Sequence, residues 1–186
     1  MSVMEQTATS TWTLDPAHSL VEFSAKHMMI TTVKGRFGTV SGTLVLDEAN
    51  PAASTAEVEI DAASIDTRTE QRDAHLRSAD FLDVEGHPTL TFRSTRIEGA
   101  FRQPGDEFTV HGDLTIRGTT REVKLDATLE GYGRDPWGGE RASFSATTKI
   151  DRRDFGLTWN QAVEAGGVLV GNAVTITLEV QAVKAG

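Results

Sequence analysis

Apolar side chains recur at every second position through most of this chain, and this period restricts the fold more than any other feature of the sequence. From Val21 to His27, for example, the odd-numbered positions are Val, Phe, Ala and His, whereas the even-numbered positions are Glu, Ser and Lys. This alternation is typical of a half-buried β-strand, because successive side chains of a strand point to opposite faces. The same pattern is found at 21–27, 43–47, 56–61, 89–93, 108–116, 123–129, 144–150 and 174–180. We therefore predict an all-β fold of about eight antiparallel strands.

One stretch, at about 66–77, lacks this alternation. It is rich in good helix formers, and Asp66 and Glu70 precede Arg72 and Arg77, an order that suits the dipole of a helix. The sequence therefore predicts one short helix at about 66–77.

The connections between the strands indicate how they are arranged. Turn-forming residues lie between several strands, as in Arg117-Gly118-Thr119 and around Asp135-Pro136, and short connections favour an up-and-down order. Such strands hide their edges most completely by closing into a barrel, and a barrel of about eight strands is either filled by side chains or wide enough for one ligand.

The predicted inward faces are rich in small residues, which favours a cavity over a filled interior. These small residues are Ala25, Ala56, Gly112, Ala127, Gly131, Ala142 and Ala146. A two-sheet sandwich in which large and small side chains alternate is the alternative interpretation.

The length of 186 residues predicts a single domain, which we place at 11–186. Residues 1–10 are small and polar, without the apolar run of a secretion signal, and they are predicted to form a disordered leader. No later stretch predicts an integral membrane segment, so the expected location is cytoplasmic.

Composition excludes several kinds of chemistry and partner. The chain has no cysteine, which excludes disulfides, thiolate metal sites and cysteine nucleophiles, and its net charge of −9 disfavours nucleic acid as a partner. It contains no His-x-x-x-His or His-Glu-x-x-His pair, so no metal site and no cofactor are predicted. It also lacks a Gly-x-Ser-x-Gly elbow and a phosphate-binding glycine loop, so no catalytic residue is predicted.

Five blocks of sequence, in a fixed order, point to one family. They are Trp12–Phe23 with His27, Val33–Phe37 and Gly42; Ser64–Thr67 with Arg72–Phe81; His87-Pro88 with Phe92–Ser94; Gly112–Thr120; and Ile150–Gly156. On these blocks, which extend the match from Trp12 to about Val183, the chain resembles the YceI-like, polyisoprenoid-binding family. The resemblance implies a lipocalin-like barrel with a helix across one side and an elongated apolar pore. That pore would hold an isoprenoid chain, such as that of an isoprenoid quinone or of a polyprenyl phosphate. Many members of the family are periplasmic, whereas this sequence shows no signal peptide.

A site for an isoprenoid should be a wall of apolar side chains, because such a ligand is held by burial of its hydrocarbon. The predicted ligand-binding residues are the inward-facing Phe23, Ala25, His27, Phe37, Val58, Phe92, Leu114, Ile116, Leu125, Ala127, Phe144, Ala146, Ile176 and Leu178. His27 is included because it is in phase with Phe23 and could bond a quinone carbonyl or a headgroup oxygen; a core histidine bonded to backbone is the alternative. The headgroup candidates, provided that they converge at a barrel mouth, are Lys34, Arg36, Arg72, His75 and Arg152.

Three functions remain open on the sequence. The favoured one is binding of a long-chain polyisoprenoid for storage or transport, without covalent chemistry; an exposed edge near the last strand or an apolar barrel mouth could also support a homodimer. The second is an enzyme that converts an apolar substrate in the same cavity with some of His18, His27, Asp73 and His75. The third is a filled barrel with a structural or stress-related role.

Overall fold

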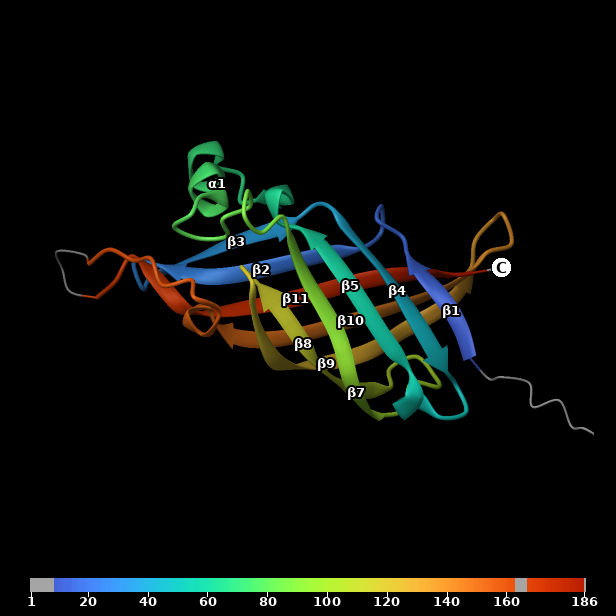
Figure 1. Ribbon diagram of the computed structural model, residues 1–186. Coiled ribbons are helices and arrows are strands. Elements are labelled where there is room, and N and C mark those ends of the chain that lie inside the picture. The colour runs from blue at the N-terminus through green and yellow to red at the C-terminus, as the bar shows by residue number, and fades with distance from the viewer. Residues whose placement is uncertain (1–8, 163–166, 186) are drawn as a thin grey trace, which may run out of the picture.

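The wall of the fold is one antiparallel β-sheet that closes on itself, with a short helix at one end (Figure 1). The computed structural model describes residues 9–162 and 167–185. The strands are β1 (Thr9–Leu14), β2 (Leu20–His27), β3 (Thr31–Phe37), β4 (Val40–Asp47), β5 (Thr55–Asp61), β6 (Ile65–Asp66), β7 (Thr89–Gly99), β8 (Glu107–Ile116), β9 (Thr119–Arg134), β10 (Glu140–Asp151) and β11 (Val170–Lys184). The helix α1 spans Glu70–Arg77, and short 3-10 turns are found at Pro51–Ala53, Ala62–Ser64 and Arg152–Phe155.

The strands of the described ranges occupy eight positions around the barrel. The hydrogen-bonded order is β1-β4-β5-β7-β8-β9-β10-β11, and β11 pairs with β1 to close the ring. The strands β2, β3 and β6 prolong β1, β4 and β5, because β2 pairs with both β11 and β3, and β6 pairs with β3. The prediction of about eight antiparallel strands in a closed, up-and-down barrel is therefore confirmed.

Strand β1 (Thr9–Leu14) has no counterpart among the predicted strands, the first of which is at 21–27. Thr9 and Ser10 pair with Asp47 and Leu46 of β4, so the predicted leader is wrong at these two positions. The rest of that leader, 1–8, lies outside the described residues.

The helix begins at Glu70, so its predicted start at residue 66 is four residues too early. Asp66 belongs instead to β6, where it pairs with Arg36 of β3. The Asp66 side chain then accepts a hydrogen bond from the backbone of Arg68 at 2.8 Å, and Arg68 has a φ of +65°, which a helix cannot contain. This local turn precedes the helix, which therefore begins only at Glu70.

Glycine on two strands gives room for aromatic rings that point into the barrel. A Cβ atom at Gly112 of β8 would overlap the ring of Phe92 on β7, and one at Gly35 of β3 would overlap the ring of Phe23 on β2. These rings thus lie flat against the wall instead of crossing the interior.

The two ends of the barrel differ. The β2–β3 turn and α1 lie toward one end, whereas the β9–β10 turn and the end of β11 lie toward the other (Figure 1). The first of these is called here the hairpin end.

Candidate functional site

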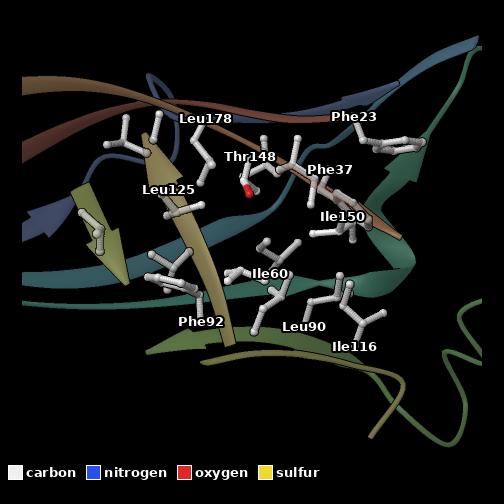
Figure 2. Close-up of a pocket in the computed structure, with 18 of the residues that line it drawn as sticks. Phe23, Phe37, Ile60, Leu90, Phe92, Ile116, Leu125, Thr148, Ile150 and Leu178 are labelled. Atoms are coloured by element: carbon white, nitrogen blue, oxygen red, sulfur yellow. The ribbon is translucent and has the colours of Figure 1, made fainter. Parts of the chain in front are cut away.

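The interior of the barrel contains an apolar cavity of about 260 Å³. One water molecule needs only about 10–15 Å³ of such space, so this cavity is far larger than a packing defect. Figure 2 shows side chains from several strands around it, among them Phe23, Ile60 and Leu178, and Thr148 as a labelled polar residue. The barrel is therefore not filled by its own side chains, which argues against a filled structural barrel.

The strand alternation identified thirteen of the residues that form this wall. The predicted residues that line the cavity are Phe23, Ala25, Phe37, Val58, Phe92, Leu114, Ile116, Leu125, Ala127, Phe144, Ala146, Ile176 and Leu178. Whether each of them contacts a ligand stays a prediction, because lining a cavity is a geometric property of the empty barrel.

Small side chains create part of the space. Ala146 of β10 pairs with Ala127 of β9, so two alanines lie side by side on the inner wall. Ala25 and Ala56 line the same cavity. Of the other small residues singled out in the sequence, Ala142 is buried outside the lining, and a Cβ atom at Gly131 would meet no neighbour within 4 Å.

Sequence reasoning missed lining residues on strands, such as Leu14, Ile65 and Ile97, and also the part of the lining that lies outside the strands. Leu76 of α1, Phe81 and Leu82 of the turn after it, and Leu157 after the third 3-10 turn all line the cavity from the hairpin end. Phe101, which follows β7, lines it as well. The residues outside the strands carry no strand period, so only their apolar character could have signalled them.

His27 does not line the cavity, which contradicts its predicted inward role. It pairs with Val170, but the register between β2 and β11 shifts between this pair and the Ala25–Val174 pair. His27 is also the last residue of β2 before the turn. His27 therefore lies beyond the register shift in β11, past the part of β2 that lines the cavity.

The headgroup candidates do not converge. Lys34 and Arg36 are exposed on β3, and Arg36 lies 3.8 Å from Asp66. The guanidinium of Arg72 donates to the hydroxyl and carbonyl oxygens of Thr67, both at 2.7 Å.

His75 is also engaged outside the cavity. Its Nε2 lies 2.9 Å from Asp80, and its ring makes edge contacts with Phe81 and Trp159 at centroid distances of 5.0 and 4.6 Å. Of the five headgroup candidates, only Arg152 lines the cavity.

Arg152 is 3% exposed and is bonded to backbone carbonyls. Its guanidinium donates to the carbonyl oxygens of Leu157 at 2.6 Å, Trp159 at 2.8 Å, Gly171 at 2.9 Å and Val170 at 3.3 Å. Burial lowers its pKa from the ordinary arginine value. This arginine thus ties the segment after β10 to the start of β11, and most of its donors are already used.

The residues of the enzyme alternative are dispersed. His18 follows β1 and bonds to Asp15, His27 ends β2, and Asp73 and His75 lie on α1. Asp73 is buried and accepts hydrogen bonds from the backbone and hydroxyl of Thr67. None of the four lines the cavity, so the described residues do not assemble the predicted acid–base pair around it.

Within residues 9–162 and 167–185, no group of three or more His, Cys, Asp or Glu side chains is arranged to hold a metal ion. The helices of that same part of the chain are too short or too polar to cross a membrane.

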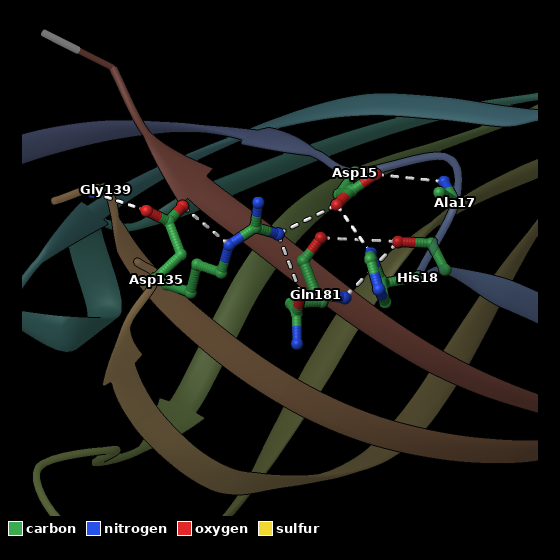
Figure 3. Close-up of polar contacts among 8 residues, drawn as sticks. Asp15, Ala17, His18, Asp135, Gly139 and Gln181 are labelled. Carbon is green, nitrogen blue, oxygen red and sulfur yellow. Dashed lines mark hydrogen bonds and ion pairs between the residues drawn. The ribbon is translucent and has the colours of Figure 1, made fainter. Parts of the chain in front are cut away.

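A polar cluster links the two edges of the sheet where they meet (Figure 3). The carboxylate of Asp15 accepts from Arg141 at 2.8 Å, lies 2.7 Å from His18 Nδ1 and accepts from the backbone of Ala17 at 3.0 Å. Arg141 also donates to Asp135 at 3.0 Å and to the side chain of Gln181 at 2.8 Å. The cluster joins the turn after β1, the β9–β10 turn and β11, so it holds the barrel closed away from the hairpin end.

This cluster predicts a specific pH dependence of stability. The hydrogen bond from Arg141, followed by that from His18, lowers the pKa of Asp15 from 3.8 to about 2. Because the pKa is lowered in the folded state, the stabilisation is complete above about pH 4 and is lost as the pH falls toward 2. We expect the melting temperature of Asp15→Asn to fall less steeply than that of the wild type between pH 4 and pH 2, measured by circular dichroism.

The melting temperature of Asp15→Asn should still fall somewhat between pH 4 and pH 2, because the pKa of Asp151 is also about 2 through its bonds with Arg153. Equal slopes for the two proteins in this window would contradict a stabilising Asp15 carboxylate.

Comparison with known proteins gives a consistent result. Residues 12–182 match the family described as the YceI-like domain. The chain is 44% identical over 140 residues to Protein YceI of Escherichia coli O157:H7, a match that covers 75% of this chain and 71% of that protein. Among solved structures, it is similar to BcnA of Burkholderia cenocepacia, with a TM-score of 0.77, 25% identity and coverage of 90% and 98% of the two chains. A polyisoprenoid binding domain from Saccharophagus degradans has the same fold, with a TM-score of 0.69, 15% identity and coverage of 97% and 100%.

Proposed function

Because this chain belongs to the YceI-like family, we propose that it binds a long polyisoprenoid in the barrel cavity and stores or carries it. The observation that carries the proposal is the apolar cavity inside a closed barrel. The related fold from Saccharophagus degradans, described as a polyisoprenoid binding domain, supports the same class of ligand.

The apolar wall is sufficient for binding. Burial of one CH₂ group contributes about 0.8 kcal/mol, so about four isoprene units, or roughly twenty carbons, contribute on the order of 10 kcal/mol before the costs of ordering. No ionic anchor is needed, and the structure is consistent with this, because the charged residue of the lining, Arg152, is bonded to four carbonyls.

The tail is thus the recognised part of the ligand, and the head lies at a barrel mouth. An isoprenoid quinone and a polyprenyl phosphate both have such a tail and both fit this proposal. Binding requires no covalent step and no further cofactor.

The test is organic extraction and mass spectrometry of protein purified from its native host. We expect about one isoprenoid per chain, because so apolar a ligand is released only slowly into water, and the mass identifies the head. The matched sample is protein delipidated by denaturation and refolding, then offered a long-chain isoprenoid quinone or a polyprenyl phosphate. An empty native extract together with no uptake of either lipid would refute the proposal.

A further inference from the structure

The turn between β2 and β3 exposes three consecutive apolar side chains. Met28, Met29 and Ile30 are 45%, 62% and 79% exposed. An apolar patch of this kind at the tip of a hairpin is typical of an interaction site, whereas single exposed apolar residues are ordinary.

The backbone holds these side chains outward in a conformation that does not suit them. Met28 and Met29 both have positive φ, at 52° and 65°, and the carbonyl of His27 accepts from the Ile30 N–H at 3.2 Å. Turns with two central residues of positive φ favour Asn-Gly, because other side chains are strained there. The Met28 N–H also donates to the carbonyl of Leu169 at 2.8 Å, so the turn is fixed against the chain before β11. For the stability of the fold alone, Asn and Gly would suit this turn better than two methionines.

The tip lies beside the accessible part of the cavity. Phe23 and Ala25, on the strand that leads to the turn, line the cavity and are partly exposed, as are Val170 and Val174 on the neighbouring β11. Lining residues farther along β10 and β11, such as Ala146 and Leu178, are partly exposed as well, so the accessible side of the cavity extends from the tip along these two strands. A ligand that enters next to this hairpin would pass its apolar tip.

The charge around the tip has the opposite sign to that of the whole chain. The net charge is −9, yet residues 23–35 contain Lys26 and Lys34 and no acidic residue. Lys26 and Lys34 are exposed and flank the tip on β2 and β3. A bilayer surface with anionic lipids fits this arrangement, because it accepts apolar side chains and attracts lysines. A two-fold contact with a second copy fits less well, since it would bring like charges together.

We propose that the β2–β3 hairpin tip inserts into the surface of an anionic phospholipid bilayer and places the cavity mouth at the membrane. This goes beyond lipid binding in the cavity, because the docking surface lies outside the barrel. It is tested with vesicles that contain no isoprenoid, so a negative result leaves the cavity proposal standing.

The test is flotation of the purified protein with vesicles of phosphatidylethanolamine and phosphatidylglycerol at low salt. We expect the wild type to float and the triple variant Met28→Asn, Met29→Gly, Ile30→Thr to bind about tenfold more weakly or worse, because the apolar tip is gone. Since Asn-Gly suits the turn, this variant should melt at the same temperature as the wild type or higher. Weaker flotation of the variant would therefore not be explained by unfolding. We expect Lys26→Gln and Lys34→Gln each to weaken binding up to about fivefold and to reduce its salt dependence.

The matched control is Trp137→Ser. Trp137 is 87% exposed in the β9–β10 turn, at the other end of the barrel, and should not affect flotation. The proposal is overturned if the wild type does not float, if the triple variant floats equally well, or if only Trp137→Ser stops flotation. It is also overturned if the wild type is a dimer in solution that the triple variant converts to a monomer, because a second copy would then cover the tip.

Discussion

Replacing Arg152 by methionine is expected to lower the free energy of unfolding by about 3–5 kcal/mol, measured by urea denaturation at pH 7. Methionine has a similar length and an apolar side chain, but it donates no hydrogen bond. The backbone carbonyls of Leu157, Trp159 and Gly171 would lose their donor, whereas that of Val170 keeps the side-chain amide of Asn160 as a donor at 2.8 Å. Each buried acceptor left unpaired costs about 1–3 kcal/mol, and relaxation and water entry reduce the sum.

The position of these carbonyls explains why the effect should be large. Two belong to the segment after the third 3-10 turn, and two belong to the first residues of β11. The side chain therefore joins a loop to the start of β11, where Val170 pairs with His27 of β2. A lysine at this position has three donors on a single atom and cannot reach the same carbonyls together, so Arg152→Lys should recover only part of the loss.

The neighbouring Arg153 provides the control. Its side chain is exposed, and its guanidinium bonds to Asp151 at 2.6 Å. Exposed ion pairs contribute little to stability, so Arg153→Met should leave the free energy of unfolding nearly unchanged. Equal losses for the two variants would show that the positive charge of this region, and not the carbonyl contacts of Arg152, stabilises the fold.

The alternation of side chains predicted the wall of the barrel because it is a local property. Phe23, Ala25, Leu114 and Ile116 face inward for the same reason that their neighbours face outward, and the period of two needs no knowledge of the rest of the chain. Strand β3 was overlooked because Gly35 occupies one of its inward positions, so its pattern has no apolar side chain there.

Contacts made between distant segments could not be predicted in the same way. Arg72 was a headgroup candidate because it is basic, yet its donors are directed to Thr67 by the turn before α1. The roles of Arg152 and Leu157 depend on where the segment after β10 meets β11, which no local pattern encodes. His27 followed the period but lies where the pairing of β2 with β11 shifts its register.

Filling the cavity from one wall should weaken cargo binding strongly without unfolding the barrel. Ala146 lines the cavity beside the equally small Ala127 on β9, so the ring of Ala146→Phe would enter empty space. If the ring displaces about four methylene-sized groups of the ligand, at about 0.8 kcal/mol each, affinity falls by about 3 kcal/mol, or roughly a hundredfold. The measurement is the amount of isoprenoid extracted per chain, together with uptake by the delipidated protein.

Stability distinguishes this result from a damaged fold. A ring placed in a void gains packing contacts, so the melting temperature of the delipidated Ala146→Phe variant should equal or exceed that of the delipidated wild type. Thr147→Phe is the matched control, because Thr147 is the next residue of β10, is exposed and should leave cargo unchanged. If Ala146→Phe keeps a full load of isoprenoid, the lipid is bound elsewhere on the protein, and the cavity then has another occupant. If both variants lose cargo equally, the loss results from destabilisation of β10, and the shape of the cavity does not determine binding.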